Sequence, residues 1–151
     1  MQYLSQRDPR WSQTKIGKTQ RTIGQVGCTI DCLSMISDYF GEFKNPAEIA
    51  KTLQFTSDAR IMWGSIANAF KKFKFNFRNH KRDDALIHEC ITNPDKACMI
   101  EVDYGSHWIV PIHDPSHSTD YLCVDPITGK IRLAIGDFVN ITGVAWFSRV
   151  K

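Results

Sequence analysis

The chain has 151 residues, of which 42% are hydrophobic and 23% charged, so it can bury one core without disulfides or a structural metal, and we expect a single domain over residues 1–151. The formal net charge of +3 comes from scattered basic residues and predicts no nucleic-acid partner. No apolar run approaches the roughly 18 residues of a membrane-spanning helix, which excludes that class of protein.

The start of the chain and its cysteines predict a protein made in the cytoplasm with free thiols. Residues 1–8 contain no basic segment followed by an apolar one, so we expect no secretory signal peptide. The cysteine count is five, which is odd, and no paired CxxC motifs occur, so we expect neither disulfides nor a zinc site. The cysteines are Cys28, Cys32, Cys90, Cys98 and Cys123.

The first part of the chain predicts helices after an irregular start. Proline and glycine punctuate residues 1–27, which we expect to be irregular. Apolar residues recur at helical spacing over 28–40, and Gly41 is placed to end that helix. Asn45 and Pro46 open a second helix, because asparagine caps a helix and proline suits its first position. Two further helices are predicted over 64–73 and from Asp83 to Asn93.

The last third of the chain predicts strands. Residues 97–103 and 107–113 are apolar stretches separated by a turn at 104–106. Helices therefore precede an antiparallel sheet, which predicts the α+β class. Other strands are expected near 75–77 and over 121–125, 130–135 and 143–149.

Cys28 is the first candidate for chemistry. It lies where an irregular loop enters the long helix over 28–40, and the free N–H groups and dipole of a helix N-terminus favour thiolate over thiol. Gly27 would let the chain or a substrate approach the sulfur closely. The alternative is a buried cysteine that only packs.

A cysteine nucleophile needs a base, and His107 is the best placed of the five histidines. It opens a strand directly after a glycine turn, where a side chain is held rigidly beside a cleft, and Trp108 follows to exclude water. The alternative is a structural histidine. The other histidines are His80, His88, His113 and His117.

Two further side chains would complete such a site. Asp125 ends the next predicted strand, one hairpin from His107, so it could orient the imidazole. It could also simply begin a turn before Pro126, and the two roles are compatible. An oxyanion donor is also needed, and Gln6 and Gln25 are both candidates from the residues alone.

Several motifs together resemble a known family. They are Leu4-Ser5-Gln6-Arg7-Asp8-Pro9-Arg10-Trp11, Thr22-Ile23-Gly24 and Gly27-Cys28, followed by Met35. They resemble the N-terminal segment of bacterial and phage cysteine peptidases, which are similar to the bacteriocin-leader-processing (double-glycine) peptidases. The resemblance extends over residues 3–126. It implies a papain-like fold, in which N-terminal helices carry the nucleophile and pack on a C-terminal antiparallel sheet.

The resemblance also implies a role for each of four residues. Cys28 would be the nucleophile and Gln6 the oxyanion donor. His107, in a His-Trp-Ile-Val strand, would be the base, and Asp125, in an Asp-Pro step, would orient it. The chain departs from the family pattern at Asp31-Cys32 and at Ile112-His113-Asp114, which bears on substrate choice. A charge on Asp31 facing Cys28 would oppose thiolate formation. Cys32 is expected to be buried and inert, and the alternative is a redox or metal role.

We therefore expect a thiol-dependent hydrolase of peptide or isopeptide bonds that needs no cofactor. By analogy its substrate would be cell-wall peptides, reached after lysis or from a phage particle. An amidase would use the same residues. The rival hypothesis is a non-catalytic module that binds through a groove lined by Trp11, Trp63 and Trp108. The mutual geometry of thiol, imidazole and carboxylate discriminates between enzyme and module.

Overall fold

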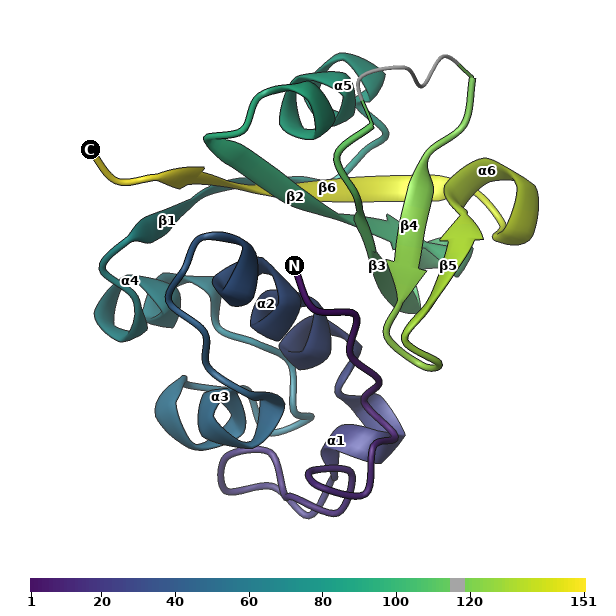
Figure 1. Ribbon diagram of the computed structural model, residues 1–151. Coiled ribbons are helices and arrows are strands. Elements are labelled where there is room, and N and C mark those ends of the chain that lie inside the picture. Colours follow the sequence, from purple (N-terminus) through teal and green to yellow (C-terminus); the bar gives the residue numbers. More distant parts are fainter. Residues whose placement is uncertain (115–118) are drawn as a thin grey trace.

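A six-stranded antiparallel sheet forms the centre of the computed structural model, which describes residues 1–114 and 119–151 (Figure 1). The strands lie in the order β1-β6-β2-β3-β4-β5, so the C-terminal strand is inserted between β1 and β2. The strands are β1 (Phe73–Asn79), β2 (Lys96–Val102), β3 (His107–Pro111), β4 (Leu122–Asp125), β5 (Lys130–Leu133) and β6 (Ile141–Arg149).

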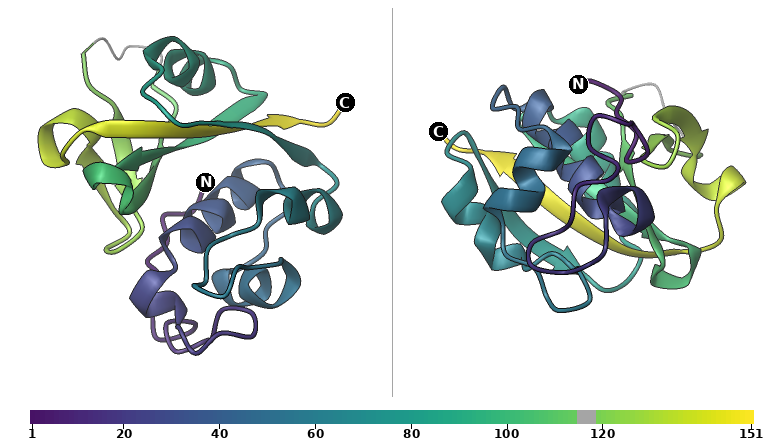
Figure 2. Two further views of the ribbon diagram at one scale, coloured as in Figure 1. Left: turned by 180° about the vertical axis from the view of Figure 1, so that it is seen from behind. Right: turned by 90° about the horizontal axis from the view of Figure 1, so that it is seen from below.

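Helices cover both faces of this sheet. The long helix α2 packs against β3, and α1, α3 and α4 lie on the same side, whereas α5 packs on the opposite face against β2 (Figures 1 and 2). The short helix α6 follows β5 at the far edge. The helices are α1 (Ile23–Val26), α2 (Cys28–Tyr39), α3 (Pro46–Thr52), η1 (Trp63–Ser65), α4 (Ile66–Ala69), α5 (Asp84–Thr92), η2 (Asp103–Gly105) and α6 (Ala134–Asp137).

The sheet separates two apolar cores. Successive side chains of a strand point to opposite faces, so in β2 Ala97 and Met99 join the core under α2, while Cys98 and Ile100 join the core under α5. Because β2 is buried on both faces, its central residues 97–100 form a continuous apolar run. This packing fixes α2 against β3, which is what brings the start of the helix to the start of that strand.

Local capping signals begin the helices where the sequence indicates. The Asn45 side chain accepts a hydrogen bond from the Glu48 amide at 2.9 Å, which forms a capping box at α3. Asp83 caps α5 in the same way by accepting from the Leu86 amide at 3.1 Å. The predicted helices at 28–40, at Pro46 and from Asp83 to Asn93 are therefore confirmed, and so is the α+β class.

The predicted helix over 64–73 is wrong in its second half. That segment contains only η1 and α4, and the chain has entered β1 by Phe73, which pairs with Arg149 of β6 and is buried. Pairing with a distant strand thus overrides the local helical spacing. The helices α1 and α6 were not predicted, because each is only four residues long. None of the described helices has both the length and the apolar character needed to cross a membrane.

Candidate active site

Cys28 is the first residue of α2, at the junction with α1. Gly27 joins the two helices, and a Cβ there would lie 2.5 Å from the carbonyl oxygen of Ile23. The close approach that Gly27 allows is therefore between the two helices. Cys28 is partly exposed, whereas the other four cysteines are buried and all five thiols are free. Its sulfur thus combines a helix N-terminus with access from solvent.

His107 and Asp125 meet at the open end of the β3–β4 hairpin. The strands pair antiparallel through Val110 and Val124, which leaves His107 at the start of β3 near Asp125 at the end of β4. His107 Nε2 lies 2.9 Å from Asp125 Oδ1, and both side chains are buried. The Asp125 carboxylate also accepts a hydrogen bond from the Ile127 amide at 3.0 Å. It therefore both contacts the imidazole and stabilises the turn between β4 and β5.

A strained turn holds His107 in place. Asp103, Tyr104 and Gly105 all have left-handed φ angles, of 53°, 57° and 83°, which are unusual for the two non-glycine residues. The turn is tied to the chain before β6, because Asp103 Oδ1 accepts from the Val139 amide at 2.8 Å. Such strain persists only where the surrounding structure enforces it, and here it sets the start of β3.

The imidazole of His107 interacts with both proposed partners. Burial by itself lowers the His107 pKa, but the hydrogen bonds to Asp125 and Cys28 and the negative charge of both outweigh burial and raise the pKa to about 9. Because Nε2 faces Asp125, Nδ1 is the nitrogen left for Cys28. Burial also opposes ionisation of Asp125, but its contact with His107, the Ile127 amide and the charge of Arg132 lower the pKa of this carboxyl.

The other histidines lie elsewhere. His113 stacks on Tyr39, and its Nε2 lies 3.0 Å from the Asn93 carbonyl oxygen, so its contacts are structural. His88 sits on α5, on the opposite face of the sheet, with its ring against Tyr121. His80 is exposed in the loop after β1. His117, the remaining histidine of the sequence, lies outside the described residues.

The two candidate glutamines are placed differently. Gln25 is exposed, and its side chain accepts from the Thr22 amide at 3.0 Å as part of the α1 capping box. Gln6 is 4% exposed, and its Nε2 lies 3.3 Å from the Ile23 carbonyl oxygen just before Cys28. The Gln6 backbone also donates to the Pro126 carbonyl at 2.6 Å, which ties it to the chain beside Asp125.

Asp31 and Cys32 are both fully buried behind the thiol. Neither oxygen of Asp31 has a hydrogen-bond partner among the described residues. Burial, together with the charge of Cys28, raises the Asp31 pKa to about 9. At neutral pH Asp31 therefore carries no charge that would oppose a thiolate. Cys32 donates to the Trp108 carbonyl oxygen at 3.5 Å, and burial raises its pKa well above the usual range, as expected for an inert thiol.

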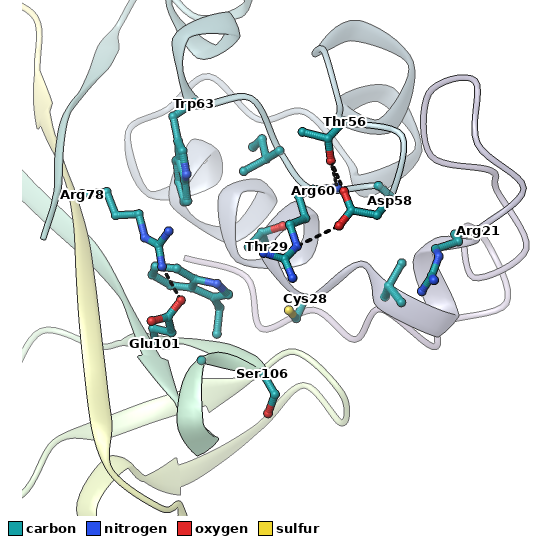
Figure 3. Close-up of a pocket in the computed structure, with 15 residues that line it drawn as sticks. Arg21, Cys28, Thr29, Thr56, Asp58, Arg60, Trp63, Arg78, Glu101 and Ser106 are labelled. Carbon is teal, nitrogen blue, oxygen red and sulfur yellow. Dashed lines mark hydrogen bonds and ion pairs between the residues drawn. The ribbon is translucent and has the colours of Figure 1, made fainter. Parts of the chain in front are cut away.

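A cleft of about 500 Å³ opens beside Cys28 (Figure 3). One wall is aromatic, because the rings of Trp63 and Trp108 lie 5.6 Å apart, edge to face. Trp11 was expected to share this groove, but it is buried and bonds the Ser5 carbonyl oxygen instead, outside the cleft lining. Within the described residues, no cluster of histidine, cysteine and acidic side chains could hold a metal ion.

The family comparison agrees with this geometry. The model of the Peptidase C39 family matches residues 18–146. The chain belongs to the Peptidase C39 family. Its members are bacteriocin-processing papain-like cysteine peptidases, so the chain is a papain-like cysteine peptidase, a thiol-dependent hydrolase that acts on peptides. Neither the curated proteins nor the solved structures gave a match.

The matched range of this C39 peptidase includes Cys28, His107 and Asp125, whereas Gln6 precedes it. Arg132 is a contact that the sequence did not reveal: its Nη1 lies 3.5 Å from Asp125 Oδ2, on the side of the carboxylate away from His107. It comes from β5, and only the pairing of Asp125 with Lys130 in the β4–β5 hairpin brings it there. No motif around Arg132 indicates this contact.

We expect Asp31→Asn to stabilise the peptidase at neutral pH. Above pH 3.8 the unfolded chain ionises Asp31, while the folded chain keeps its proton up to about pH 9, so this residue destabilises the fold increasingly as pH rises through that window. Asparagine removes that cost, which we expect to be worth about 1–4 kcal/mol at pH 7 after allowing for its own unpaired amide. The measurement is the free energy of unfolding between pH 4 and pH 8.

The gain should grow with pH and nearly vanish at pH 4. Asp38 on the same helix is the matched control, because its carboxylate accepts from the Gln2 amide at 2.7 Å. Asp38→Asn should therefore give no such gain. A stability change in Asp31→Asn that is the same at pH 4 and pH 8 would show that the Asp31 carboxyl is not held neutral.

Proposed function

We propose that this peptidase cleaves peptide bonds by a Cys-His-Asp mechanism, with Cys28 as nucleophile, His107 as base and Asp125 as the group that orients the imidazole. The observation that carries the proposal is the position of His107, whose Nε2 lies 2.9 Å from Asp125 Oδ1 and whose imidazole also interacts with Cys28. A raised His107 pKa favours the imidazolium that a Cys28 thiolate requires.

The proposed reaction has two halves. The Cys28 sulfur attacks the carbonyl carbon, and the carbonyl oxygen becomes an oxyanion that accepts from the Cys28 amide and from Gln6. His107 donates its proton to the leaving nitrogen as the C–N bond breaks, which leaves a thioester. His107 then takes a proton from water, the resulting hydroxide attacks the thioester, and the acid is released with the thiolate restored.

The choice of Gln6 over Gln25 rests on position and hydrogen bonding. The side-chain Nε2 of Gln6 is buried and contacts the carbonyl oxygens of Ile23 and Gly24 in the segment that leads to the nucleophile helix, while Gln25 is exposed and engaged in a helix cap. Gln6 is therefore the proposed second donor to the oxyanion.

Cell-wall peptides are the substrate class that we propose to test first. Release by lysis, or transport within a phage particle, would bring the enzyme to cell-wall peptides. Hydrolysis of an isopeptide or amide bond would involve the same residues. The experiment combines alkylation of the protein by iodoacetamide with assays on a peptide library and on purified peptidoglycan. Cleavage that disappears in step with alkylation of Cys28 supports the mechanism, whereas cleavage that persists after complete alkylation of Cys28 would contradict it.

We expect substitution of Asp125 to separate orientation from turn formation. Asp125→Asn should keep kcat/KM within about tenfold, because an amide can still orient the ring, while Asp125→Ala should lose roughly 10–100-fold. Asp125 is one of the groups that raise the His107 pKa, so in Asp125→Asn the fall of activity at alkaline pH should begin below about pH 9. The measurements are the pH dependence of kcat/KM and the melting temperature of each variant.

Asp120, just before β4, is the control for an aspartate whose role is only structural. Its carboxylate accepts from the amides of Ile135 and Gly136 at 2.8 and 2.9 Å and lies away from the site. Asp120→Ala should therefore lower the melting temperature while the folded enzyme keeps its activity. If the Asp125 variants lose stability and turnover in parallel, as a turn residue would, the orienting role is wrong.

A further inference from the structure

The cleft beside Cys28 holds more hydrogen-bond donors than its own carboxylates use. Two carboxylates line it, Asp58 and Glu101, and both oxygens of each are engaged. The oxygens of Asp58 contact Thr56 and Arg60, with the Arg60 Nε at 3.2 Å. Those of Glu101 contact Arg78 of β1 and Thr142, the latter at 2.9 Å.

The guanidinium groups of the cleft, in contrast, have donors to spare. An arginine carries five N–H donors, and Arg60 uses only its Nε toward Asp58, so its terminal nitrogens have no partner among the described residues. Arg21 also lines the cleft, and its guanidinium makes no hydrogen bond or ion pair in the described part of the chain, although its charge helps to lower the Asp58 pKa. In Figure 3 the Arg60 and Arg78 side chains reach into the cleft from opposite sides.

Stability does not explain the position of Arg60. Its side chain is 82% exposed, and an ion pair between such exposed groups contributes little to folding. Arg78 differs, because it lies 5.1 Å from the Trp108 ring centroid and pairs with a buried glutamate. The paired Arg78 and Glu101 thus form part of the wall, while Arg60 and Arg21 remain to meet a ligand.

We propose that this cleft selects peptides that carry an acidic residue close to the cleaved bond. The carboxylate of that residue binds Arg60 and Arg21, because a planar guanidinium is the best-matched partner of a carboxylate. A neighbouring apolar side chain of the peptide packs on Trp63 and Trp108. This inference rests on the proposed peptidase function and names its substrate class. Acidic peptides are attracted and neutral or basic ones are not, because the unengaged groups in the cleft are cationic.

The test profiles cleavage sites in a peptide library and then compares a cleaved peptide with its Glu→Gln or Asp→Asn counterpart. The wild-type enzyme should show enrichment of Asp and Glu at one position near the cleaved bond and a higher kcat/KM for the acidic peptide of the pair. Arg60→Glu and Arg21→Glu should each reduce the acidic-to-neutral ratio of kcat/KM by about two- to fivefold, the range expected of one exposed charge pair.

Arg82→Glu is the matched control, because Arg82 also pairs with an aspartate two residues away, Asp84, but lies at the start of α5 on the opposite face of the sheet. It changes the net charge equally and should leave the ratio unaltered. Cleavage with no acidic preference, or an equal loss of preference in Arg82→Glu, would overturn the cleft assignment while leaving the peptidase function intact. A wild-type enzyme that cleaves no peptide at all would instead contradict the proposed function.

Discussion

Cys28→Ala is expected to lower peptide hydrolysis by at least about 10⁴-fold without unfolding the enzyme, because it removes the sulfur that forms the thioester in the proposed mechanism. Cys28 is partly exposed at the first position of α2, where alanine is well tolerated, so the melting temperature should stay near that of the wild type. The measurements are turnover on a cleaved library peptide and thermal unfolding of the same preparation.

Alkylation gives an independent measure of the same residue. Iodoacetamide should modify Cys28 first at neutral pH, because its sulfur is partly exposed beside His107 while the other thiols are buried. Mass spectrometry of digested samples gives the rate for each cysteine. Cys32→Ala, one helical turn further along α2, is the control and should keep both activity and alkylation at Cys28. Equally fast alkylation of Cys32, or substantial turnover by Cys28→Ala, would remove Cys28 from the mechanism.

His107→Ala is expected to reduce kcat/KM by about 10²–10⁴-fold, the range of a lost general base. In the wild type, activity should fall as pH rises through about 9, because the imidazolium that pairs with the thiolate then loses its proton. Added imidazole should restore part of the activity of His107→Ala, since the substitution leaves a space between Asp125 and Cys28. The measurement is kcat/KM as a function of pH and of imidazole concentration.

His113→Ala is the control at the far end of the same hairpin. It would lose the stacking on Tyr39 and the contact with the Asn93 carbonyl oxygen, so we expect lower stability and nearly full activity of the folded enzyme. If His113→Ala is as inactive as His107→Ala while still folded, the site lies at the other end of β3. A His107→Ala enzyme that remains fully active would exclude His107 as the base.

Local signals in the sequence determined much of this peptidase. Capping residues such as Asn45 and Asp83 place helix starts, because a side-chain acceptor must lie next to the free N–H groups. The apolar pattern behind Cys28 predicts α2, and the glycine turn before His107 predicts the start of β3. These signals act over a few residues, so Cys28, His107 and Asp125 could be named as candidates from the sequence with family resemblance as support.

Tertiary structure alone decided how those residues are partnered and what surrounds them. Phe73 is a strand residue instead of a helical one because Arg149 of β6, 76 positions later, pairs with it. The neutral state of Asp31 follows from complete burial, and a sequence position in the first turn of a helix predicts an ionised carboxylate instead. The unengaged donors of Arg60 and Arg21 likewise became visible only when folding placed them in one cleft, since sequence reports charges but not which of them are already paired.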